Sequence, residues 1–87
     1  MKLVSKPIDI VVVFCKNETP RPYKFLYIDE DGEEHEVKID KILGVTEHRI
    51  PGVSTLMYDC QSIKGCNAYR YQLNFDPKTL RWILYKI

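Results

Sequence analysis

The pattern of hydrophobic and polar positions predicts six β-strands, and it is clearest in the last third of the chain. Residues 55–62, 68–75 and 80–87 alternate apolar and polar side chains, as strands with one buried face do. Between them, Lys64-Gly65 fits a two-residue hairpin loop, and the Asp-Pro-Lys-Thr sequence at 76–79 fits a type I turn. Both turns, chosen independently, bring apolar residues to one face, so we predict a three-stranded antiparallel meander.

The same two turns predict which residues lie opposite one another. The later turn pairs Leu73 with Trp82, and the earlier loop pairs Leu73 with Leu56. On the other face of the meander, this register sets Asp59 across from Arg70.

The last predicted strand differs from its neighbours because its second face, with Ile83, Tyr85 and Ile87, is also apolar. These side chains need a cover, and the first predicted strand, residues 8–16, is the natural candidate. Residues 8–16 are apolar on both faces, which is typical of a central strand. Pairing of the last strand with the first would close the sheet into a barrel. An open sheet with a partner chain on this edge is the alternative.

Two further strands are predicted at residues 23–28 and 35–42, around the turn signal Asp31-Gly32. Their register stays open. A two-residue turn would pair Leu26 with Val37, and a bulged loop of odd length would pair Tyr27 with Val37 and Phe25 with Ile39.

Residues 43–54 lack a clear period and contain Pro51-Gly52, so we predict a loop there, with a helical turn near residues 40–43. The expected fold is all-β: a single domain over residues 1–87, built as a small antiparallel barrel or strongly curved sheet of about six strands.

Charge is balanced overall but uneven along the chain. The 87 residues carry 13 basic and 12 acidic side chains, for a net charge of +1. Six of the acids fall within residues 29–36, which leaves 13 basic and six acidic residues elsewhere. The sequence therefore predicts an acidic hairpin tip on a mildly basic body.

The cysteines and the first residues bear on the cellular compartment. Cys15, Cys60 and Cys66 make an odd count, and Lys6 and Asp9 interrupt any apolar export signal. These features favour a cytoplasmic, reducing setting with free thiols, Cys60 being buried and Cys66 lying in a turn. The longest apolar run is also too short to span a membrane, so no membrane partner is expected.

No residue pattern points to catalysis, a metal ion or a cofactor. The histidines and cysteines lack the paired spacing of a zinc site. In the acidic run from Asp29, glycine comes fourth, whereas a calcium-binding EF-hand loop needs it sixth. Nothing pairs a nucleophile with a base, and no glycine-rich turn offers a phosphate cradle. We therefore expect a protein that is not an enzyme and holds no cofactor.

Aromatic and basic residues interleave in two places, as they do in small barrels that bind single-stranded nucleic acid. Strand alternation sends Tyr69, Tyr71 and Trp82 into the core, however, and Arg70 outward. The basic residues expected at the surface make up the candidate binding surface, as one patch or several: Arg21, Lys24, Lys38, Lys41, His48, Arg49, Arg70 and Arg81.

A longer motif can be followed through most of the chain. It runs from Pro22-x-x-Phe25-x-Tyr27 through Val37 and Ile42-Leu43 to Tyr71-x-Leu73-x-Phe75-Asp76, five further residues and Trp82-x-Leu84. This motif resembles a group of small bacterial β-domains of unknown function, which stand alone or beside error-prone DNA polymerases. The resemblance covers residues 20–87 and implies a β-fold, with no catalytic residues to carry over. Residues 43–54 and the acidic tip depart from it.

These observations favour a non-catalytic accessory module that binds another protein, with the last predicted strand offering an edge to the partner. Homodimerisation through the last or first strand would use such an edge as well. The alternative is a nucleic-acid-binding accessory protein, in DNA repair as the resemblance implies. That function requires basic side chains on one contiguous surface.

Overall fold

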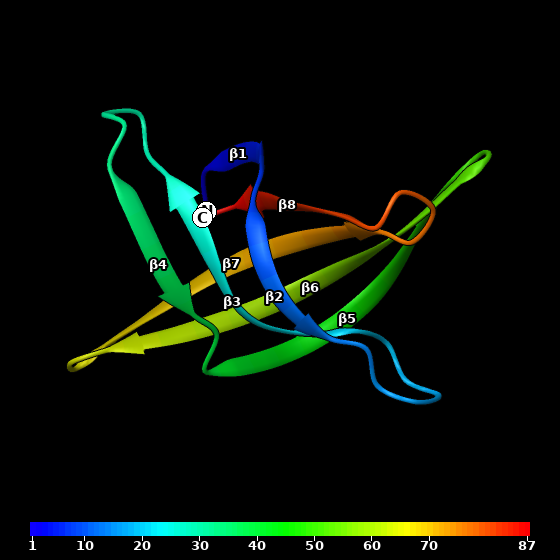
Figure 1. Ribbon diagram of the computed structural model, residues 1–87, viewed down its shortest axis with the longest axis horizontal. Coiled ribbons are helices and arrows are strands. Elements are labelled where there is room, and N and C mark those ends of the chain that lie inside the picture. Colours follow the sequence, from blue (N-terminus) through cyan, green and yellow to red (C-terminus); the bar gives the residue numbers. More distant parts are fainter.

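The computed structural model describes residues 1–87, except for the side chain of Ile50, and contains eight β-strands in this part of the chain (Figure 1). The strands are β1 (Leu3–Pro7), β2 (Asp9–Val13), β3 (Arg21–Ile28), β4 (Glu34–Lys38), β5 (Lys41–Ile50), β6 (Val53–Lys64), β7 (Asn67–Asp76) and β8 (Arg81–Lys86). Within the described residues, no helix has the length and apolar character needed to cross a membrane.

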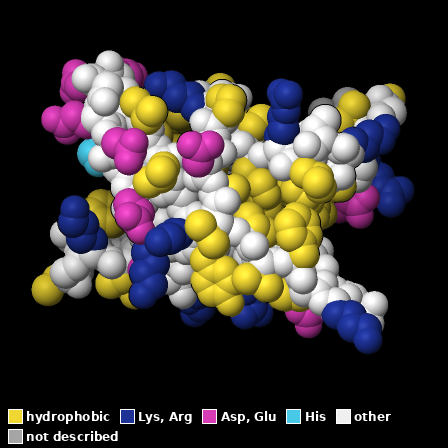
Figure 2. All heavy atoms as spheres, viewed as in Figure 1, with side chains coloured by type: hydrophobic (Ala, Val, Ile, Leu, Met, Phe, Trp, Pro, Cys, Tyr) yellow, Lys and Arg dark blue, Asp and Glu magenta, His cyan; other side chains and the backbone are white. Residues whose placement is uncertain are grey.

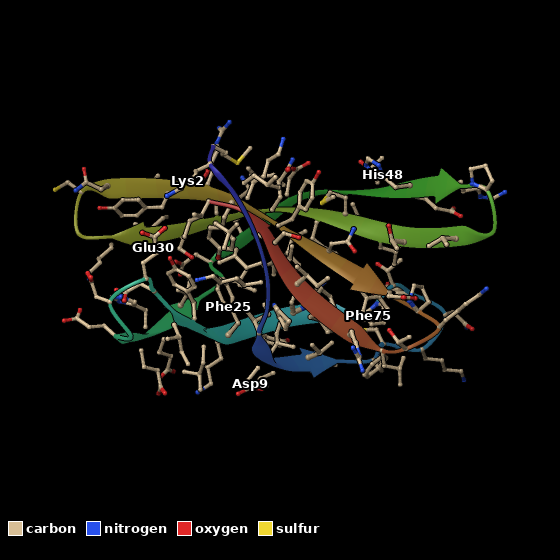
Figure 3. The ribbon with its side chains drawn as sticks, turned by 90° about the horizontal axis from the view of Figure 1, so that it is seen from above. Lys2, Asp9, Phe25, Glu30, His48 and Phe75 are labelled. Atoms are coloured by element: carbon tan, nitrogen blue, oxygen red, sulfur yellow. The ribbon has the colours of Figure 1, made fainter. Side chains whose placement is uncertain are left out.

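The strands form two antiparallel sheets that face each other as layers (Figure 3). The large sheet has the order β1-β8-β7-β6-β5, and the small sheet has the order β2-β3-β4. Two short connections join the layers. Between β1 and β2, the Ile8 N–H donates to the Trp82 carbonyl at 3.3 Å, and between β4 and β5, the Ile39 N–H donates to the Tyr23 carbonyl at 2.8 Å. The antiparallel all-β prediction is confirmed, but the sheets do not close into a barrel.

The core lies between the two layers and is dominated by aromatic rings. Trp82 packs with Phe75 and Tyr58, at ring-centroid distances of 4.6 Å and 5.0 Å. Phe25 reaches in from the small sheet and meets the edge of Tyr71 at 5.5 Å. In Figure 3, Phe25 and Phe75 lie between the layers, whereas Asp9 and His48 lie on opposite outer sides. The remaining buried hydrophobic residues of this cluster are Ile39, Cys60, Leu73 and Leu84.

The C-terminal meander is confirmed as β6, β7 and β8, but its predicted register is wrong by two residues. Leu73 lies opposite Tyr58 and Leu84, rather than Leu56 and Trp82. Both loops lie further along the chain than their turn signals indicate: the first is Gly65-Cys66, with Gly65 at φ +63°, and the second ends at Leu80. A shift of two preserves the face of every side chain, so the predicted apolar face survives the error.

The first predicted strand, residues 8–16, is not one central strand. The chain crosses from the large sheet to the small sheet at Ile8, so β1 ends before it and β2 begins after it. β8 is paired by β1, in residues 3–7 that were not predicted as a strand, so the predicted pairing of residues 8–16 with the last strand is wrong. β2 is an edge of the small sheet.

Residues 43–54 form a hairpin and not the predicted loop. β5 pairs with β6 along its length, and the chain turns at Pro51-Gly52, where Gly52 has φ +81°. The predicted strand at 35–42 is broken at Ile39 and Asp40, where the chain changes sheets, and the helical turn predicted near residues 40–43 is absent. The Asp40 Oδ2 atom accepts a hydrogen bond from the Ile63 N–H at 2.7 Å and so ties this corner to β6.

The β3–β4 hairpin has neither of the two predicted registers. Val37 lies opposite Phe25, which leaves residues 29–33 as the loop. Asp29 closes this loop, because its Oδ1 atom accepts hydrogen bonds from the N–H groups of Asp31 and Glu33, both at 2.9 Å. A side-chain cap of this kind stabilises a longer loop than the Asp-Gly signal alone predicts.

Candidate functional site

Four edges in the described strands have no strand beside them: β1 and β5 in the large sheet, and β2 and β4 in the small sheet. An open edge presents backbone N–H and C=O groups that can pair with another chain. Proteins commonly guard such edges with prolines, bulges or charged side chains. The four edges differ in how well they are guarded.

Three of the edges carry these features. β1 ends in Pro7 and its register shifts between Leu3 and Lys6. β4 has the sequence Glu-His-Glu-Val-Lys and is therefore mostly charged. β5 bulges between Ile42 and Gly44 and then carries Glu-His-Arg before its last residue.

β2 has no proline and its one charged residue is Asp9; its register with β3 shifts between Val11 and Val12, but the extra residue there, Tyr23, belongs to β3. The other four residues of β2 are Ile10, Val11, Val12 and Val13. Ile10 and Val12 pack against the core. Val11 and Val13 point to the other side and are 51% and 44% exposed, and Phe14, directly after the strand, is 64% exposed. β2 therefore combines an open edge with β-branched residues and an apolar outer face.

The surface beside β2 has an apolar centre and a charged rim. On the outer face of the small sheet, Val11 lies opposite Lys24, and Leu26 lies between Asp9 and Glu36. These five residues line a shallow depression of about 260 Å³. The Lys24 Nζ and Glu36 Oε1 atoms pair at 3.2 Å on its rim. Figure 2 shows hydrophobic side chains gathered beside β2, on the side away from β4.

The predicted basic surface is divided by the fold. Arg21, Lys24 and Lys38 lie on the outer face of the small sheet, because their strand neighbours Pro22, Phe25 and Val37 point into the core. By the same alternation, a second group lies on the outer face of the large sheet. Arg49 belongs to neither group: it lies near the tip of the β5–β6 hairpin, where its Nε pairs with Glu47 Oε1 at 2.7 Å. The second group comprises Lys41, His48, Arg70 and Arg81.

The group on the large sheet is itself divided. Lys41 and Arg70 both lie opposite Gln61 and so occupy one row across three strands. His48 lies opposite Thr55, six residues further along β6, which corresponds to about 20 Å. The structure thus brings together Lys41 with Arg70 and Lys24 with Lys38, and it does not unite the eight residues in one patch.

Two predictions about single side chains have different outcomes. Trp82 and Tyr71 are buried as predicted, but Tyr69 is 52% exposed, because the end of the β6–β7 hairpin extends beyond the small sheet. All three cysteines are free; Cys60 is buried and Cys66 is exposed in the turn, as predicted. Burial raises the pKa of the Cys60 thiol to about 12 and that of the Tyr71 hydroxyl to about 12, so neither ionises near neutral pH.

Asp29, Glu33 and His35 bring carboxylate and imidazole atoms within 4.8 Å of one another. The arrangement is accounted for by the loop. The Asp29 Oδ1 atom caps two backbone N–H groups, and Oδ2 pairs with His35 Nε2 at 2.7 Å. These contacts, the His35 hydrogen bond first, lower the pKa of Asp29.

In comparisons with known proteins, the chain matches no family model, no curated protein and no solved structure. The resemblance to small bacterial β-domains therefore stays a prediction. The site rests on the geometry alone.

Sequence reasoning expected the last predicted strand to offer an open edge, which is wrong. β8 lies between β1 and β7 and has no open edge. β2 lies within the first predicted strand, which was considered as an edge for homodimerisation but was interpreted as a central strand because it is apolar on both faces. No local signal in the sequence distinguishes this edge strand from a covered one, because the neighbours of β2 are set by long-range pairing.

Proposed function

We propose that this protein is a non-catalytic interaction module that binds an extended segment of another protein along β2. The observation that carries the proposal is the contrast among the four open edges of the described strands: β2 has one charged residue followed by four β-branched residues in succession, and two of these, Val11 and Val13, are exposed on its outer face. Strand addition at such an edge gains affinity from backbone hydrogen bonds and specificity from pockets for alternate side chains.

The surface beside β2 indicates what the added segment should look like. Alternate residues of the segment would lie on the outer face of the small sheet, next to Val11 and Val13. Those residues should be apolar, because they would continue the apolar centre formed by Val11 and Leu26. The residues between them would meet Phe14 and the open side of the core.

The test is a capture experiment with matched variants. The double variant Val11→Lys with Val13→Lys places two charges beside the β2 edge. The control, Thr46→Lys with His48→Lys, places two lysines on the outer face of the β5 edge, where both native residues are exposed. We expect the β2 variant to retain its protein partner at least about tenfold more weakly than the wild type. The control should retain it as well as the wild type does.

Equal loss in both variants, or no loss in either, would remove β2 as the binding edge. Sedimentation of the purified protein separates self-association from binding of another protein, because pairing of β2 with β2 would double the mass. Circular dichroism of both variants verifies that each remains folded.

The alternative proposal is nucleic-acid binding, in support of DNA repair. Its best surface is the row of Lys41 and Arg70, where the intervening residue is the uncharged Gln61. This alternative has weaker support, because His48 and Arg81 lie at the other end of the outer face of the large sheet and the acidic Asp59 lies between them and the row of Lys41 and Arg70. Capture that disappears with nuclease, and that Arg70→Glu weakens but Arg21→Glu does not, would favour it.

A further inference from the structure

A second hollow, separate from β2, lies where the β6–β7 hairpin extends beyond the small sheet. It has a volume of about 510 Å³, within the range of about 300–1,000 Å³ that small-molecule sites occupy. β4 forms one wall with Val37, and the hairpin forms the other with Tyr69 and the backbone at Ile63. Phe25 and Tyr71 form its floor. In the remainder of this section it is called the hairpin cleft.

The floor of the hairpin cleft has no hydrogen-bond donor to offer. Ser62 Oγ donates to the Lys38 carbonyl, so the short contact of 2.6 Å between Ser62 Oγ and Tyr71 Oη requires Tyr71 to be the donor. Both hydroxyl protons are thereby used within the protein. The floor, with the edge-to-face rings of Phe25 and Tyr71, therefore accepts an apolar group.

The walls add apolar surface that the fold leaves uncovered. Tyr69, which lies opposite Ser62 on the core side of the large sheet, is 52% exposed although it lines the cleft. Exposed aromatic and aliphatic side chains around a concave surface are typical of a ligand site rather than of solvated sheet.

The charges at the mouth of the cleft favour an anion. Of the two acidic side chains there, Glu36 pairs with Lys24 at 3.2 Å, whereas Asp40 accepts the Ile63 N–H at 2.7 Å and keeps its charge, so two unpaired lysines face one unpaired carboxylate. Lys38 and Lys64 also line the cleft, and in the part of the chain that the structure describes neither has a carboxylate within 4.0 Å.

We infer that the hairpin cleft binds a small amphipathic anion, a carboxylate with an aliphatic or aromatic tail. The tail lies on the rings of Phe25 and Tyr71 beside Tyr69, and the carboxylate lies at the mouth between Lys38 and Lys64. This site is separate from the surface beside β2, because the two hollows share only the buried Phe25 and the rim residue Glu36, and neither Val11 nor Val13 lines the cleft.

The test uses decanoate as the probe. Its binding is monitored by the amide chemical shifts of the protein in ¹H–¹⁵N spectra. Decanoate should shift the amides of Val37, Ile63 and Tyr69 in a single saturable process. Decanol, which has the same tail without the charge, should bind at least about fivefold more weakly. Tyr69→Ala should weaken decanoate binding about fivefold, whereas the control Tyr23→Ala, at a tyrosine that is 47% exposed elsewhere, should leave it unchanged.

The charge is tested separately, because Lys38→Gln with Lys64→Gln leaves the rings in place. This double variant should bind decanoate and decanol alike, and the control Lys16→Gln with Lys78→Gln should not. The inference is overturned if decanoate shifts no cleft amide, if its shifts map to Val11 and Val13, or if decanol binds as tightly as decanoate to the wild type.

Discussion

The two edges of the small sheet are alike in length and position but opposite in chemistry. β2 and β4 each have five residues and each pairs with β3. Both turn hydrophobic side chains inward, Ile10 and Val12 from β2 and Val37 from β4. Outward, β4 presents Glu34, Glu36 and Lys38, whereas β2 presents Val11 and Val13 after Asp9.

The contrast separates two requirements on an edge strand. The inward residues serve the core, and both strands meet that requirement in the same way. The outward residues determine whether the open edge avoids pairing with other chains, and β4 meets this second requirement with charged side chains. The outward residues of β2 do not protect its open edge in this way, and we therefore propose that a partner covers β2.

The largest effect is expected from the residue that supports both edges. Phe25 lies at the centre of β3 and is 1% exposed, so Phe25→Ala should lower the free energy of unfolding by about 3–5 kcal/mol. The neighbouring Tyr23→Ala should cost no more than about 1 kcal/mol, because Tyr23 is 47% exposed. Denaturant unfolding measures both. Similar losses for the two variants would contradict the packing of β3 against the large sheet.

Alkaline pH should also weaken the core that both edges share. Burial raises the pKa of Tyr71 from 10.0 to about 12, so the folded protein holds this proton more tightly than the unfolded chain. The corresponding stabilisation is fully present below pH 10 and is lost as the pH rises through 12. Burial raises the pKa of Cys60 from 9.0 to about 12, which adds to the loss in the same direction from pH 9 upward. Thermal unfolding between pH 8 and pH 12 should show this decline, and Tyr71→Phe should reduce it.

The inward and outward residues of β2 should differ in a stability measurement. Ile10→Ala removes a side chain that packs on the core and should cost about 1–2 kcal/mol, as should Val37→Ala in β4. Val11→Ala should change stability by about 0.5 kcal/mol or less, because Val11 is half exposed. A large cost for Val11→Ala in the isolated protein would show that its side chain serves the fold and not a partner.

The smallest effect is expected at low pH, which should loosen the β3–β4 loop and leave β2 unchanged. Asp29 caps the β3–β4 loop, and its pKa is lowered first by the His35 hydrogen bond and then by the Glu33 N–H. Its contribution is therefore present above the unfolded pKa, near 3.8, and is lost as the pH falls through the lower folded value. Amide exchange at Asp31 and Glu33 should accelerate there, while amides of β2 stay protected. Asp29→Asn should remove this pH dependence.

The accuracy of the structure predicted from the sequence differs between parts of the molecule. The meander was predictable because turn residues and alternation agree there. Its register was not, since a shift of two keeps Leu73 and Tyr71 on the same face. The β5–β6 hairpin was missed because it extends past the core, so Thr46 to Arg49 are polar on both faces and leave no period to detect.

The candidate site was harder to predict than the fold. Whether Val11 and Val13 are covered depends on where β2 sits in its sheet, which follows from long-range pairing and not from the local pattern. The basic residues were identified individually, but the strand register that divides them between two outer faces cannot be derived from charge alone. The hairpin cleft depends on an overhang of β6 and β7, whose length follows from the position of the Gly65-Cys66 turn.

The most direct test of β2 as the binding edge is site-specific photo-crosslinking in the source cell's lysate. A benzophenone side chain is placed in turn at Val13 in β2, at Glu36 in β4 and at Thr46 in β5, all three of which are exposed. We expect one specific protein adduct from position 13 and none from positions 36 and 46. Adducts from position 36 or 46 alone, or the same adducts from all three positions, would contradict the assignment of the partner to β2.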